Sequence, residues 1–354
     1  MSHYHVGISS DFKTHAPGRL EPLLAELFDP KPEISYSYFN ATGQDDDGPY
    51  VTPQDVKDFD AVILLAYRFS AASFVPGNRV GVIARWGVGY DSVDVSAATA
   101  HDVLLAITVD GVRRPVAEAI LTLLLALAKK LPDKDKLVRV GRWDLRGDLP
   151  AVGLRGKTVG SVGLGNIGSD MFRLLAPFEL GRQLAADPYA YPGQAKEFGV
   201  ELVDLETVFR ESDFVTVNCP LTDETDGLVN AHLLSLMKPT AYLINTARGP
   251  IVNQGALVAA LQAGQIAGAG LDVFAEEPIA IEHPLLQMDN VILAPHALAW
   301  TDELYRLCSQ FACENVLTVF RGEIPEHTVN KDVTIRSTFL EKLQNLSARR
   351  GVAR

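Results

Sequence analysis

A short glycine-rich motif, Gly163–Gly168, constrains the fold of this chain more than any other feature. It follows the β-prone run Thr158–Val162 and precedes a segment of helical character. In that context Gly163 allows a tight turn, Gly165 lets the backbone approach a pyrophosphate, and Gly168 lets the helix pack closely on the strand. The N-terminus of such a helix offers unpaired N–H groups to phosphate. The motif therefore predicts a dinucleotide-binding α/β fold.

An acidic residue favours one dinucleotide over the other. Asp187 ends the next β-prone run, 19 residues after Gly168. A carboxylate in this place accepts hydrogen bonds from ribose hydroxyls and repels a 2′-phosphate. The residues that follow, Pro188–Tyr191, include no arginine that would bind that phosphate. We therefore expect NAD, with NADP less favoured.

Runs of β-branched and apolar residues alternate with helix-length intervals along the chain, a pattern typical of parallel sheets with helical crossovers. Near the N-terminus these runs are His5–Ile8, Ile34–Phe39, Ala61–Ala66 and Val80–Ala84. Six more follow, at Thr158–Val162, Gln183–Ala186, Phe214–Val217, Ala241–Ile244, Ala269–Val273 and Val291–Leu293. The six predict a doubly wound parallel sheet.

Four other segments carry structural expectations. A long apolar helix should open at Pro115, because proline fits the first turn of a helix. The stripe of apolar residues over Asp302–Arg321 predicts a final long helix, and Ala41–Pro53 predicts a surface loop with a solvated acidic run. Charged residues beyond Asn330 indicate a solvated terminal helix; the basic ones are Lys331, Arg336, Lys342, Arg349, Arg350 and Arg354.

Composition limits the partners of the chain. Its 354 residues suffice for two domains, and a net charge of -12 argues against binding to nucleic acid phosphates. The longest apolar stretch, Ala117–Ala128, is shorter than the ~20 residues of a membrane span. The three cysteines lack metal-ligand spacing, and the N-terminus lacks a signal peptide. We expect a cytoplasmic protein without metal, membrane or nucleic acid partners.

Three polar side chains follow the later strands, at the edge where ligands bind in open α/β sheets. Arg248 can hold carboxylate and carbonyl oxygens, and His296 can give a proton to an oxygen as hydride arrives. Glu277 would hold the imidazole. Singly, these residues could be a surface ion-pair member, a core histidine and a solvated loop residue. Together they suit reduction of a 2-keto acid.

Further segments make the chain resemble the D-isomer-specific 2-hydroxyacid dehydrogenase family, from about Tyr4 to Asn330. Besides the glycine motif, the matching segments are Arg85–Asp91, Pro115–Glu118, Gly141–Trp143, Cys219–Thr222, Asn245–Gly249, Asp272–Pro278 and Pro295–His296. The resemblance implies reversible hydride transfer between NAD(H) and a small 2-hydroxy or 2-keto acid.

The resemblance also implies roles for individual residues. Arg248, Glu277 and His296 would be catalytic, and Arg248 and His296 would contact the substrate together with the backbone of Val88 and Gly89. The expected cofactor contacts are the three glycines, Asp187, Asn166, Ile167, Cys219, Pro220, Thr225, Thr246, Ala247 and Asp272.

The domain arrangement is likewise implied by the family. A Rossmann NAD-binding domain at residues 112–299 would be inserted in a smaller, flavodoxin-like substrate domain made of residues 1–111 and 300–354. Family members usually form homodimers through the region of Ala117–Leu149, so we expect a homodimer.

Two alternatives stay open at this stage. A formate dehydrogenase shares the fold, but it pairs its histidine with glutamine, and Glu277 argues against it. A corepressor-like protein of this fold would sense NAD without turnover. The identity of the acid, and the roles of Arg68, Arg113, Arg114 and Trp300, are not determined by the sequence.

Overall fold

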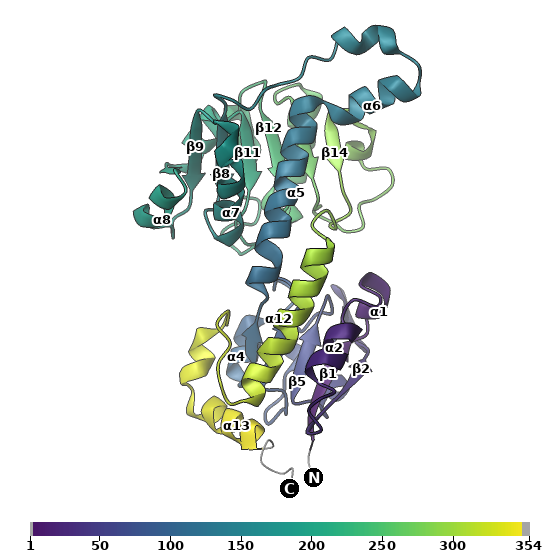
Figure 1. Ribbon diagram of the computed structural model, residues 1–354, viewed down its shortest axis with the longest axis vertical. Helices are drawn as coiled ribbons and strands as arrows, with labels where there is room; N and C mark the ends of the chain where they lie inside the picture. The colour runs from purple at the N-terminus through teal and green to yellow at the C-terminus, as the bar shows by residue number, and fades with distance from the viewer. Residues whose placement is uncertain (1–2, 349–354) are drawn as a thin grey trace. The chain divides into compact units, whose positions relative to one another are not determined.

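The computed structural model describes residues 3–348, which divide into two compact units (Figure 1). One unit is continuous, Arg113–Trp300, and the other combines the residues up to Val112 with those from Thr301 onward. The boundaries expected for this unit, residues 112 and 299, each lie one residue before the observed ones. That the two units serve as NAD-binding and substrate domains stays a prediction.

A seven-stranded parallel sheet forms the centre of the continuous unit, in the order β10-β9-β8-β11-β12-β13-β14. The strands are β8 (Thr158–Val162), β9 (Arg182–Ala186), β10 (Glu201–Leu202), β11 (Phe214–Val217), β12 (Tyr242–Asn245), β13 (Gly268–Leu271) and β14 (Val291–Leu293). The doubly wound sheet is thus confirmed. The sequence missed β10, which at two residues is too short to produce a pattern.

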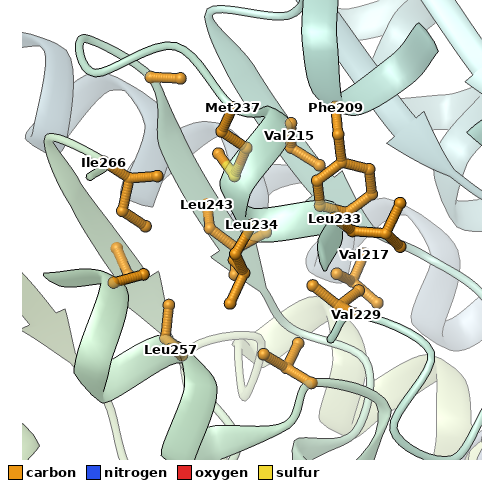
Figure 2. Packing of buried hydrophobic residues seen from close by; sticks show 14 of the residues in the cluster. Phe209, Val215, Val217, Val229, Leu233, Leu234, Met237, Leu243, Leu257 and Ile266 are labelled. Carbon is orange, nitrogen blue, oxygen red and sulfur yellow. The ribbon is translucent and has the colours of Figure 1, made fainter. Parts of the chain in front are cut away.

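Helices cover both faces of this sheet because successive strand residues point to opposite sides. On one face Phe214 and Tyr242 pack with α5 (Val109–Lys129) and α7 (Asn166–Leu175). On the other, Val215 joins the cluster of Figure 2. The helices contributing to that second cluster are α9 (Leu205–Glu211), α10 (Ala231–Leu236) and α11 (Gln254–Gln262). The remaining helices of the unit are α6 (Leu131–Arg139) and α8 (Pro192–Glu197).

The second unit contains a five-stranded parallel sheet in the order β2-β1-β5-β6-β7. Its strands are β1 (Tyr4–Ser9), β2 (Ile34–Phe39), β5 (Ala61–Leu64), β6 (Val82–Arg85) and β7 (Leu104–Ala106). Its helices are α1 (Phe12–His15), α2 (Glu21–Leu27), α3 (Pro53–Val56), α4 (Val95–Ala100), α12 (Asp302–Phe320) and α13 (Ser337–Ser347). Helix α12, where the sequence predicts it, returns to this sheet, and Trp86 Nε1 donates a hydrogen bond to its Ser309 Oγ at 3.1 Å.

The expected start of α5 was wrong. The helix begins at Val109, so Pro115 lies inside it and removes one backbone hydrogen bond. Val109 and Val112 are both buried, and their burial stabilises the turns that precede the proline. Farther on, Arg114 Nε donates to Glu118 Oε1 at 2.6 Å, which is an ordinary ion pair along the helix.

The segment Ala41–Pro53 is not an irregular loop. It contains an antiparallel hairpin of β3 (Gly43–Asp45) and β4 (Gly48–Tyr50). The acidic run is paired by Arg68, whose guanidinium bonds to Asp45 and to Asp47. Arg68 therefore has a structural partner within its own unit.

The terminal helix is also less solvated than expected, because α13 buries Phe339 completely. Lys342 Nζ donates to the backbone oxygens of Val80 and Asp102 at 3.1 and 2.9 Å, and burial lowers its pKa to about 8. Arg336 Nε donates to an oxygen of Asp102 at 2.7 Å. Three of the basic residues considered, Arg349, Arg350 and Arg354, lie outside the described residues. Within residues 3–348, no helix is long and apolar enough to cross a membrane.

Candidate active site

The glycine motif forms the turn between β8 and α7. Gly163 has φ +97°, and a Cβ atom there would lie 2.9 Å from the carbonyl carbon of Asn218. At Gly168 a Cβ atom would lie 2.8 Å from the oxygen of Gly163. Gly165 caps the helix and is exposed, with no atom within 4 Å of the corresponding Cβ position. Gly163 and Gly168 thus meet the steric requirements assigned to them, and the backbone at Gly165 is open to solvent, whereas its approach to a pyrophosphate stays a prediction.

The peptide groups of Leu164, inside this turn, are held from two sides. Asp187 Oδ2 accepts a hydrogen bond from the Leu164 N–H at 2.7 Å, and its Oδ1 accepts one from the Tyr189 N–H at 2.8 Å. Gln194 Nε2, on α8, donates to the Leu164 carbonyl at 2.6 Å. Asp187 therefore shapes the turn in addition to the expected ribose contact, and Gln194 is a residue that sequence reasoning missed.

Two buried oxygen atoms test whether these residues fit a cofactor. Thr246 Oγ1 and Asn218 Oδ1 are both inaccessible to solvent, and within residues 3–348 neither has a hydrogen-bond partner. Buried polar atoms are nearly always paired, so these two oxygens are free to bond to a polar ligand. These orphaned oxygens, with the open turn at Gly165, fit a dinucleotide.

Other expected cofactor contacts differ in what their side chains do. Thr225 Oγ1 donates to the Pro220 carbonyl at 2.6 Å and accepts from the Thr222 N–H at 2.8 Å, so it shapes its own loop. Burial raises the pKa of the Cys219 thiol to about 11, which keeps it protonated and unreactive. Asn166 and Ile167 form the first turn of α7, and Ala247 donates its N–H to Asn245 Oδ1 at 3.0 Å. Their contacts with a cofactor stay predictions.

His296 and Glu277 lie together, as the sequence predicted. His296 Nδ1 is 2.7 Å from Glu277 Oε2. The side chains are 44% and 36% exposed, so a small molecule can reach them. His296 has φ +53°, an uncommon backbone conformation that is typical of functional sites.

The electrostatics of the site keep Glu277 ionised. Burial raises the pKa of this carboxyl, but hydrogen bonds from His296 and from the Phe274 N–H lower it by more, so the net pKa lies below its ordinary value. The charge of Arg248 contributes to the lowering, which places all three predicted catalytic residues within electrostatic reach. An ionised carboxylate can accept a hydrogen bond from the imidazole ring and hold it in place.

The turn that carries Arg248 is organised by a buried residue that the sequence analysis did not single out. Asn245, at the end of β12, is 1% exposed, and its Nδ2 donates to the Arg248 carbonyl at 2.9 Å. Gly249 follows, and a Cβ atom there would lie 1.8 Å from the oxygen of Phe274. The Arg248 turn and the Glu277 loop are therefore in backbone contact.

Asp272 supports the histidine segment. Its carboxylate accepts hydrogen bonds from the N–H groups of Ala297 and Leu298 at 3.1 and 3.2 Å. It is almost fully buried, and burial raises its pKa. The expected contact with the nicotinamide stays a prediction, whereas its structural role in holding the residues after His296 is direct.

Val88 and Gly89 belong to the other unit, in the loop after β6. The preceding Gly87 exchanges hydrogen bonds with Thr108: its N–H donates to Thr108 Oγ1 at 2.7 Å, and its carbonyl accepts from the Thr108 N–H at 3.0 Å. The loop is thus anchored at its base. Its binding of a substrate carboxylate stays a prediction.

No cluster of three or more His, Cys, Asp or Glu side chains that could hold a metal ion occurs in the described part of either unit.

Comparison with known proteins agrees with this geometry. The family model for the NAD binding domain of D-isomer specific 2-hydroxyacid dehydrogenases matches residues 121–297. A glyoxylate reductase of Thermofilum pendens is 38% identical over 295 residues, which cover 82% of this chain and 87% of that protein. The chain belongs to the D-isomer-specific 2-hydroxyacid dehydrogenase family. It is accordingly an oxidoreductase that acts on CH–OH groups.

Solved structures of the family have the same fold. D-lactate dehydrogenase of Aquifex aeolicus, complexed with NAD and lactic acid, shares 25% identity at a TM-score of 0.77, covering 92% of this chain and 99% of that one. An NADPH-dependent glyoxylate/hydroxypyruvate reductase of Sinorhizobium meliloti, in complex with citrate, shares 29% identity at a TM-score of 0.73, covering 92% and 96%. Since these relatives name different cofactors, family membership leaves NAD and NADP as alternatives.

Proposed function

We propose that this dehydrogenase uses NAD(H) to interconvert a small 2-keto acid and the corresponding D-2-hydroxy acid. The observation that carries the proposal is the 2.7 Å contact between His296 and Glu277, with Arg248 in electrostatic reach, on the same sheet as the glycine motif. An acid–base pair and a cation next to a dinucleotide turn are the parts that carbonyl reduction requires.

In the proposed mechanism the glycine motif and Asp187 would hold NAD(H), which when bound would supply the hydride for C2 of the keto acid. His296 keeps one ring N–H on the Glu277 carboxylate, and the other ring nitrogen gives its proton to the carbonyl oxygen. Arg248 holds the carbonyl oxygen and a carboxylate oxygen through its planar set of donors. In the reverse direction the neutral His296 takes the hydroxyl proton.

The experiment that tests the proposal is a panel of 2-keto and 2-hydroxy acids, followed by the absorbance of NADH and of NADPH. We expect turnover of a small keto acid such as glyoxylate, the substrate in the name of the Thermofilum relative. Tight NADH binding without turnover of any member of the panel would instead favour the corepressor-like alternative.

The preference for NAD rests on Asp187, and its replacement gives a direct test. In Asp187→Ser we expect the ratio of kcat/KM with NAD to that with NADP to fall about tenfold or more, because a negative charge facing the 2′-phosphate is lost. Since the ratio compares two cofactors on the same variant, any loosening of the Leu164 turn affects both. Asp223→Ser, at an exposed position after Cys219–Thr222, is the matched control. An unchanged ratio in Asp187→Ser contradicts the assignment.

We further propose that the chain forms a homodimer through the segment Leu131–Pro150, which stands away from the sheet of its own unit (Figure 1). Large apolar side chains in this segment are 58–62% exposed, namely Leu131, Val138, Val140 and Trp143. A group of exposed apolar side chains is typical of an interface.

This proposal predicts that Val138→Asp shifts the molar mass in solution, measured by light scattering, from a dimer to a monomer. A buried unpaired carboxylate is costly at an interface. Ile281→Asp, which changes an even more exposed apolar residue outside the segment, should leave the mass unchanged. A wild-type monomer, or a dimeric Val138→Asp, refutes the assignment.

A further inference from the structure

The loop Asp272–Pro278, which carries Glu277, is held by a side chain outside the reacting residues. Gln254 begins α11, and its Oε1 accepts a hydrogen bond from the Ala275 N–H at 3.0 Å. The preceding amide, the Phe274 N–H, donates to Glu277 Oε1 at 3.0 Å. Two consecutive amides of the loop are therefore fixed, one by Glu277 itself and one by Gln254.

A histidine lies against the other end of the Gln254 amide. His283 Nε2 lies 2.9 Å from Gln254 Nε2, and the Leu285 N–H donates to His283 Nδ1 at 3.2 Å. Gln254 and His283 are half-buried, so water replaces these contacts only in part. The Ala275 N–H can only donate, so it fixes Oε1 on its side of the amide and leaves Nε2 facing the histidine.

We propose that Gln254 is a positioning residue that fixes the Glu277 loop and thereby the distance between Glu277 and His296. The inference rests on the proposed function, in which Glu277 holds the imidazole during proton transfer. Gly249 makes the position of the loop consequential, because it is in backbone contact with Phe274 and any shift there also disturbs the Arg248 turn.

The proton count of His283 predicts how a carboxylate would fit in place of the Gln254 amide. A neutral imidazole has one N–H and one acceptor nitrogen, so while Nδ1 accepts from the Leu285 N–H, Nε2 carries the proton and cannot accept from the Gln254 amide. In Gln254→Glu the carboxylate accepts from the Ala275 N–H and from His283 Nε2–H, and Nδ1 accepts from Leu285. The glutamate satisfies every contact, whereas the near-isosteric Gln254→Met satisfies none.

We therefore expect Gln254→Met to lower kcat by ~10–100-fold, the scale of a small misplacement of catalytic groups. The dissociation constant for NADH should stay at the wild-type value. The acid limb of the kcat/KM profile should move to higher pH, because weaker hydrogen bonds to Glu277 leave burial to raise its pKa. Gln254→Glu should restore kcat and the profile to within about threefold of wild type. Gln262→Met, an exposed position at the far end of α11, is the matched control.

Hydrogen–deuterium exchange of the Ala275 amide provides a readout that does not depend on turnover. Its exchange should be faster in Gln254→Met and close to wild type in Gln254→Glu. Wild-type kcat, pH profile and amide exchange in Gln254→Met overturn the inference, as does a Gln254→Glu that is as impaired as Gln254→Met. If the wild-type protein itself turns over no 2-keto acid, the proposed function fails. The exchange rate of the Ala275 amide then tests by itself whether Gln254 positions the loop.

Discussion

His296→Gln is expected to lower kcat for 2-keto acid reduction by ~10²–10⁴-fold, the usual contribution of general acid–base catalysis. Glutamine fills a similar volume and can still donate to Glu277 Oε2, which lies 2.7 Å from His296 Nδ1 in the wild type. It cannot release or take up a proton near neutral pH. Stopped-flow measurement of NADH oxidation separates the chemical step from product release.

Two comparisons make this result specific. His232→Gln changes an exposed histidine of α10 that pairs with Glu206, and it should retain wild-type kcat. NADH binding by His296→Gln should also be preserved, because the glycine motif is untouched. Retention of wild-type turnover by His296→Gln would exclude His296 as the acid–base residue.

The second large effect is expected at Arg248. Arg248→Lys should reduce kcat/KM for the keto acid by ~10²–10³-fold, since lysine keeps the charge but loses the planar fork that binds two oxygens at once. The positive charge near Glu277 persists, so the pH profile should change little. Initial rates at varied keto acid concentration, with NADH saturating, measure the effect.

Arg210→Lys, in the exposed pair with Glu206 on α9, is the matched control and should leave kcat/KM unchanged. An equally small effect of Arg248→Lys would show that a point charge is enough, and it would contradict the two-oxygen contact. A rise in the KM for NADH instead of the KM for the keto acid would place Arg248 on the cofactor.

The parts of the site that could be predicted are those whose signal is local. A tight turn after a strand requires glycine at a fixed position because the backbone there has a positive φ, and Gly163 has this conformation. Arg248 and His296 follow strands, and the parallel order of β12, β13 and β14 brings strand ends to one edge of the sheet. Pattern and topology therefore suffice for these residues.

Gln194 and Gln254 could not be predicted as supporting residues, because their partners are remote in sequence. Gln194 and Leu164 are 30 residues apart, and Gln254 and Ala275 are 21 apart. No periodicity links such pairs; they meet because of how loops stack at the sheet edge. Tertiary contacts also outweighed local propensity elsewhere. They explain why α5 starts early and why Arg68 pairs with the hairpin.

The division of the chain between its two units has a consequence for the order in which they can be completed on the ribosome. The unit with the glycine motif is finished once Trp300 has been translated, whereas the N-terminal sheet still lacks the partners of Trp86 and Leu105. Ser309 and Asn330, which accept those hydrogen bonds, are translated only after Trp300. Although synthesis begins with the N-terminal unit, that unit is the later of the two to mature, and until then its apolar surface needs protection from aggregation.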